Sequence, residues 1–150
     1  MTTFMAFLHH AGAFGLVAAL SAELVLLGGE LTARTARRLR VADLMVGLSA
    51  MTVLAAGLLR VFYFEKGSAY YFQSAAFHAK LGLFVALALL SIYPTVVFAS
   101  WGKAMRRGEA PDFEPGRLRK VRAIVHTELA GIVLIVLFAA MMARGVGLFG

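Results

Sequence analysis

Four long apolar runs constrain this sequence more than any other feature. They span residues 4–29, 41–64, 77–101 and 121–143. Each is near or above the ~20 residues that a helix needs to cross the ~30 Å hydrocarbon core of a bilayer. A helix satisfies its backbone hydrogen bonds internally, whereas an open strand in lipid would leave N–H and C=O groups unpaired. We therefore expect an all-α integral membrane protein with four spanning helices.

The composition favours one membrane domain over residues 1–150 and excludes an ordinary soluble domain. Hydrophobic residues make up 61% of the chain and charged residues 15%, against about 45–50% and 25% in soluble domains. The net charge of +7 comes from basic residues that cluster beside the apolar runs. We therefore expect contact with the lipid bilayer and no nucleic-acid binding. The chain has no cysteine, which excludes disulfides and thiolate metal ligands.

The distribution of lysine and arginine predicts the orientation of the helices. Four arginines lie between the first and second runs, and six lysines and arginines lie between the third and fourth, with Arg122 at the start of the fourth. On the opposite side, only Lys66 and Arg144 lie outside the runs. Since short connections favour antiparallel neighbours, we expect an up-down-up-down four-helix bundle. We place it in a bacterial inner (plasma) membrane, with both termini outside and the basic loops in the cytoplasm.

Ionisable residues inside the apolar runs are costly in lipid, so each is a candidate functional residue. They form two layers. The outer layer, on the side of the termini, contains His9, His10, Arg60, His78 and Lys80. The inner layer contains Glu23, Asp43, Tyr93, His126 and Glu128. At 100° per residue, His9 and Glu23 lie within about 40° of each other on one helical stripe, whereas His10 points about 100° away.

The outer layer favours a cofactor site. Histidines from different helices can bind a b-type haem through their ring nitrogens, and His10 and His78 are the candidate axial pair. Arg60 and Lys80 would pair with the propionates, because cationic side chains bind carboxylates well. A metal site would instead use His10, His78 or His126.

The inner layer favours a different class of function. Glu23, His126 and Glu128 could form a relay for ion- or proton-coupled transport, or for an accessory membrane subunit. Four helices make a narrow bundle, so a transporter would need to form a homo-oligomer. In a third interpretation the charges only fix the topology, and Arg60 and Lys80 extend toward the membrane interface.

Two resemblances bear on these alternatives. The segment from Gly57 to Phe72, with Phe77–Phe84 and Ser91–Thr95, resembles an uncharacterised family of bacterial predicted four-helix membrane proteins. That likeness covers most of the chain and implies an inner-membrane protein without naming an activity.

The second resemblance is more remote. His10, the segment His78-Ala79-Lys80-Leu81 and the loop from Gly116 to Arg122 are similar in placement to HemJ-type protoporphyrinogen oxidases and CopD-like membrane proteins. It implies a membrane oxidoreductase that handles haem b or a porphyrin. For such an activity the candidate catalytic residues are Arg60, Lys80 and Glu23. Residues 29–32 read Gly-Glu-Leu-Thr, where those oxidases carry an arginine-aromatic-histidine motif.

Overall fold

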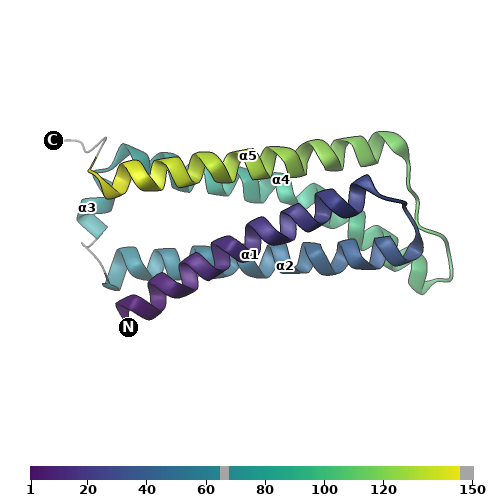
Figure 1. Cartoon of the computed structure of the whole chain (residues 1–150), viewed down its shortest axis with the longest axis horizontal. Helices are drawn as coiled ribbons and strands as arrows, with labels where there is room; N and C mark the ends of the chain where they lie inside the picture. The colour runs from purple at the N-terminus through teal and green to yellow at the C-terminus, as the bar shows by residue number, and fades with distance from the viewer. Residues whose placement is uncertain (65–67, 146–150) are drawn as a thin grey trace.

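The computed structural model describes residues 1–64 and 68–145 as a bundle of four long helices (Figure 1). Both termini lie at one end of the bundle, and the α1–α2 and α4–α5 connections lie at the other (Figure 1). The expected all-α, up-down-up-down architecture is therefore confirmed. The elements are α1 (Thr2–Gly28), α2 (Ala33–Leu59), the π-helical turn η1 (Arg60–Phe64), the short α3 (Ser68–Phe72), α4 (Ala75–Arg106) and α5 (Pro115–Ala143).

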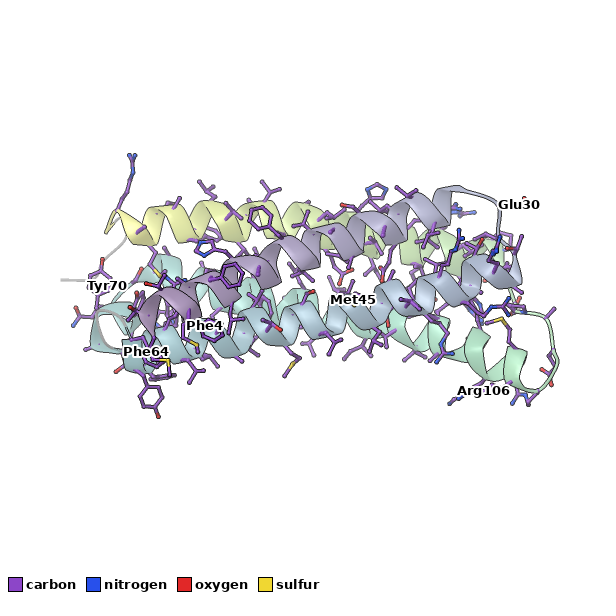
Figure 2. The ribbon with its side chains drawn as sticks, turned by 60° about the horizontal axis from the view of Figure 1, so that its bottom comes forward. Phe4, Glu30, Met45, Phe64, Tyr70 and Arg106 are labelled. Atoms are coloured by element: carbon purple, nitrogen blue, oxygen red, sulfur yellow. The ribbon has the colours of Figure 1, made fainter. Side chains whose placement is uncertain are left out.

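The two ends of the bundle differ in sequence. We call the end with residues 29–40 and 103–122 the basic end, and the end with both termini the terminal end. In Figure 2, Glu30 and Arg106 mark the basic end, and Phe4, Phe64 and Tyr70 mark the terminal end. Lys66 lies outside the described residues. Helices α2, α4 and α5 extend well beyond the predicted spans at the basic end, where α2 begins at Ala33 and α5 at Pro115.

Side-chain caps fix where three of the helices begin. The hydroxyl of Thr32 accepts a hydrogen bond from the N–H of Thr35 at the start of α2, and the hydroxyl of Ser74 accepts one from Phe77 at the start of α4. At the start of α5, the Glu114 carboxylate accepts bonds from the N–H groups of Gly116 and Arg117, at 2.8 and 2.9 Å. Such caps satisfy N–H groups that have no partner within the helix.

The four helices form a closed ring of neighbours. Helix α1 packs on α2 and α5, and α4 also packs on α2 and α5. Helices α1 and α2 approach each other closely at two glycines. A Cβ added at Gly12 would lie 3.0 Å from Val53 Cγ2, and one at Gly15 would lie 2.8 Å from Ser49 Oγ. Small residues are typical of such interfaces in membranes, where helices associate by close contact.

The outer surface is apolar, as expected of a protein in lipid. Phe14, Val25 and Val133 expose 77%, 76% and 69% of their surface. In water such a surface would be a large aggregation-prone patch, whereas lipid tails solvate it. All four long helical segments are long and apolar enough to cross a membrane. The chain is therefore a multi-pass membrane protein.

Packing is tightest in the half of the bundle nearest the basic end. Its core includes Leu27, Leu39 and Val121, each 0% exposed, and Trp101 at 1%. The Trp101 indole N–H donates to the Asp112 carbonyl at 2.8 Å, which holds the α4–α5 loop against this core. None of these four side chains lines either of the two cavities described below.

Candidate functional site

The half of the bundle nearest the terminal end encloses a cavity of about 300 Å³. All four long helices line it, chiefly with aliphatic side chains such as Val53, Leu81 and Ile132. Pockets that hold cofactor-sized ligands measure about 300–1,000 Å³ and are mostly apolar with a few polar groups. At the terminal end the cavity adjoins a wider hollow of about 790 Å³, and the two share His9, Lys80 and other lining residues.

His9 is the best-oriented histidine at this cavity. It is half-buried on α1, and its Nδ1 lies 3.0 Å from the Val53 carbonyl oxygen on α2. A carbonyl oxygen can only accept, so Nδ1 is the donor and carries the ring proton. Nε2 of the neutral ring is then left with its lone pair. Histidines that bind metals are held in this way, with the other ring N–H bonded to a carbonyl or carboxylate.

Gly57 of α2 makes room for this ring. A Cβ at Gly57 would lie 3.1 Å from His9 Cε1 and 3.3 Å from Nδ1. Any larger residue would therefore push the imidazole away from the Val53 carbonyl. Gly57 lines the same cavity, so the sequence provides both the acceptor and the space that hold His9 in place.

The predicted cationic residues gather where the cavity opens. Lys80 lines both the cavity and the wider hollow, and Arg60 lines the hollow. Arg60 lies in the π-helical turn η1, an element that is rare and often found at functional sites. The wider turn changes the angle at which residues after Leu59 project from the helix, which a regular α-helical wheel does not predict.

The structure separates the predicted axial pair. His10 lines both spaces, and its Nδ1 lies 2.6 Å from the Ala6 carbonyl of its own helix. His78 is exposed; its Nε2 donates to the Phe72 carbonyl at 2.9 Å, and it lines neither space. His126 is also exposed, in the half nearest the basic end. No group of three or more His, Asp or Glu residues that could hold a metal ion occurs within the described chain.

A second polar group, the carboxyl layer, lies at the inner end of the cavity. It consists of Glu23 on α1, Asp43 on α2 and Glu128 on α5, whose charges act on one another. Glu23 is 1% and Glu128 4% exposed, and Asp43 is half-buried. Glu128 also lines the cavity itself. The predicted inner layer is therefore assembled from three of its members, and His126 is not one of them.

Helix α4 adds two hydroxyls to this layer. Thr95 donates to Asp43 Oδ1 at 2.9 Å, and Ser91 lies within hydrogen-bond reach of Glu128. Both residues lie close to Pro94, which is buried in α4. The sequence signal for them is the segment Ser-Ile-Tyr-Pro-Thr at residues 91–95, inside an apolar run that hydropathy alone does not distinguish.

Together these features define a polytopic helical membrane protein with an interhelical cavity that adjoins a wider hollow at the terminal end. The chain belongs to a family described as predicted membrane proteins, DUF2214, whose model matches residues 1–147. This confirms the resemblance to an uncharacterised membrane protein family. No curated protein and no solved structure matches the chain. The likeness to protoporphyrinogen oxidases and CopD-like proteins stays a prediction.

Proposed function

We propose that the protein binds haem b or a related porphyrin in the cavity of the terminal half. The observation that carries the proposal is the His9 imidazole, which faces an apolar interhelical cavity with its Nδ1 bonded to the Val53 carbonyl. The macrocycle is apolar and suits the aliphatic lining, and a neutral histidine nitrogen is a common ligand of haem iron. His9 replaces His78 as the ligand that we favour.

The cationic residues at the opening support the same ligand. Haem and porphyrins carry carboxylates at one edge, and charge-assisted bonds from lysine or arginine to carboxylate are among the stronger ones. With the apolar ring directed into the cavity, its acidic edge would meet Lys80 and Arg60. Adjacent residues on one helix cannot bind opposite faces of a planar ring, so His10 does not supply the second axial ligand.

The visible absorption spectrum tests the proposal. The protein is purified in mild detergent with and without added haemin, and spectra are recorded oxidised and reduced. We expect a Soret band that His9→Ala abolishes or shifts and that His126→Ala leaves unchanged. Lys80→Gln should weaken haemin binding by roughly tenfold. Absence of a Soret band after haemin addition rejects the haem proposal. A band that responds to His10→Ala and His78→Ala but not to His9→Ala restores the sequence-based pair.

A second candidate function, ion- or proton-coupled transport, is favoured by the carboxyl layer. Glu23, Asp43 and Glu128 come from three helices and lie inside the bundle. A relay through them would show as pH-dependent flux in proteoliposomes that Glu23→Gln reduces; equal flux in both proteins would reject it. The packed half of the bundle separates the layer from the basic end, so this function needs a further rearrangement.

We also propose that the protein lies in the bacterial inner membrane with the basic end in the cytoplasm, as the lysine and arginine distribution favours. The absence of native cysteine makes a direct test simple. In intact cells, a membrane-impermeant maleimide should label Thr3→Cys and should label Glu109→Cys only after the cells are opened. The reverse result would invert the topology.

A further inference from the structure

The carboxyl layer has a chemical property that ligand binding in the cavity does not require. Glu23 Oε1 is buried and has no hydrogen-bond partner. It is the one buried side-chain oxygen or nitrogen of this kind within residues 1–64 and 68–145. A buried carboxylate without a donor is expensive, because nothing replaces the water it has lost. This oxygen therefore points to a small species that the layer binds.

The groups that face the layer leave negative charge uncompensated. Helix α1 contributes Glu23, α2 Asp43 and α5 Glu128, while α4 contributes only the hydroxyls of Ser91 and Thr95. Two basic residues of α5 lie elsewhere: Arg122 donates to the Leu27 carbonyl, and Lys120 lies over the Tyr93 ring. Like charges in a low dielectric repel strongly, so a bound cation would stabilise the layer.

That cation is best matched by a proton. The carboxyls do not form a cluster suited to a metal ion within the described chain. A proton needs only one carboxyl oxygen, and among neighbouring carboxyls whose charges repel one another one readily stays protonated. Protonation of Glu23 removes the negative charge that makes its buried, partnerless carboxyl group most costly.

Access to the layer comes from one side. Glu128 lines the cavity, which opens toward the terminal end. In the other direction Leu27, Val121 and Val125 are 0% exposed and fill the interior. Arg122, the arginine of α5 nearest in sequence to Glu128, donates through Nε to the Leu27 carbonyl at 3.2 Å. A proton therefore enters and leaves through the cavity.

We propose that Glu23, Asp43 and Glu128 form a proton-exchange site that is reached only through the cavity. A molecule in the cavity then covers the site, and one that gains or loses protons exchanges them with Glu128. By linkage, any effect of the occupant on protonation of the layer is matched by an equal effect of pH on its binding. This inference rests on the cavity of the proposed function and not on the identity of its ligand.

A hydrophobic carbodiimide tests the site directly. The reagent reacts with a protonated carboxyl: the proton moves to a carbodiimide nitrogen while the carboxylate oxygen adds to the central carbon. With the protein in lipid nanodiscs, we expect peptide mass spectrometry to find the adduct on Glu128. Labelling should fall several-fold as the pH rises from about 6 to about 9, because the protonated fraction falls. Glu128→Gln should remove the adduct, and Ala50→Leu, which fills the cavity, should slow its formation.

The outcomes that would contradict the proton-exchange site are separate from those that would reject the haem proposal. No adduct on Glu128 at any of these pH values, or labelling that does not change with pH, overturns the proton-exchange site even if a Soret band is present. Labelling with the expected pH dependence supports the site even if haemin does not bind. If Glu128→Gln does not fold, the site is tested by locating the adduct in the unsubstituted protein and by labelling Glu23→Gln. We expect Glu23→Gln to alter the pH dependence of labelling at Glu128. An unaltered dependence would leave Glu23 outside the site.

Discussion

The two halves of this bundle use the same four helices in opposite ways. Near the basic end, Leu39, Phe98 and Trp101 fill the interior and are at most 1% exposed. Near the terminal end, the same helices enclose a cavity of about 300 Å³. Lipid supplies no hydrophobic force between helices, so close packing must stabilise the bundle. The packed half can provide that contact and leave the hollow half available for a ligand.

The comparison also explains where the polar residues lie. The carboxyl layer marks the boundary between the halves, and His9, Lys80 and Arg60 lie where the hollow half opens. Buried polar groups far from the packed core cost less, because a ligand or water can reach them. Substitutions matched between the two halves can break or sharpen this contrast.

Removal of large side chains should give the largest contrast. Trp101→Ala in the packed half should lower the free energy of unfolding by about 3–5 kcal/mol, because it leaves a void and breaks the bond to Asp112. Phe84→Ala, at a half-buried side chain that already borders the cavity, should cost less than Trp101→Ala because less packing is lost. Thermal unfolding in detergent, followed by circular dichroism, measures both. Equal losses would mean that the terminal half is as tightly packed as the basic half.

Added volume should have opposite effects in the two halves. Ala36 is 0% exposed in the packed half, and Ala36→Leu should cost about 1–3 kcal/mol because the core has no room. Ala50 lines the cavity, and Ala50→Leu should leave stability unchanged or raise it by up to about 1 kcal/mol. Unfolding temperatures compared without added ligand distinguish the two. A destabilised Ala50→Leu would show that the cavity does not accept added side-chain volume.

Substituting each of two glycines by alanine compares how their surroundings accept one added methyl group. Each Gly→Ala change gains about 1 kcal/mol of helix propensity. At Gly12 the new Cβ would lie 3.2 Å from the Val53 backbone nitrogen, which cannot move unless the helices separate, so a net loss is expected. At Gly131 it would meet Leu87 Cδ1 and Cδ2, and Leu87 can turn into the cavity it lines. Gly131→Ala should therefore unfold at a higher temperature than Gly12→Ala. A higher unfolding temperature for Gly12→Ala would contradict this explanation.

The smallest effect is expected at the start of α5, outside the membrane. Bonds from the Gly116 and Arg117 N–H groups hold the pKa of Glu114 below its usual value. A carboxyl whose pKa is lower in the folded state stabilises the fold at pH values above its unfolded-state pKa of about 4.3. This stabilisation is lost as the pH falls through the folded-state pKa. The difference in unfolding temperature between the unsubstituted protein and Glu114→Ala should be greatest near neutral pH and should shrink in acid. A difference that grows in acid would contradict the cap.

Much of the site was visible in the sequence, but not its final membership. The helical stripe predicted that His9 and Glu23 face the same side, and both do lie inside the bundle. We nevertheless chose His10 and His78 as ligands from their depth in the membrane. Depth follows from position along the chain, whereas facing depends on the rotation of each helix, which neighbouring helices set through contacts such as Gly57 with His9.

The inner layer shows the same division. Glu23 and Glu128 were expected to act together, and the structure brings them together with Asp43. His126 is two residues from Glu128, so it projects about 200° away around α5 and is exposed. Thr95 and Ser91 join the layer because α4 presents them to α2 and α5. No spacing within one segment predicts such contacts between helices.

The sequence by itself determined that the chain forms four long apolar helices of membrane-spanning length and that neighbours run antiparallel. It could do so because lipid leaves the backbone no alternative to the helix and because apolar length sets the span. Only the tertiary structure decided which half is packed, which half is hollow and that His9 and Glu128 line the hollow. Those outcomes depend on close contacts between side chains of different helices, which hydropathy does not encode.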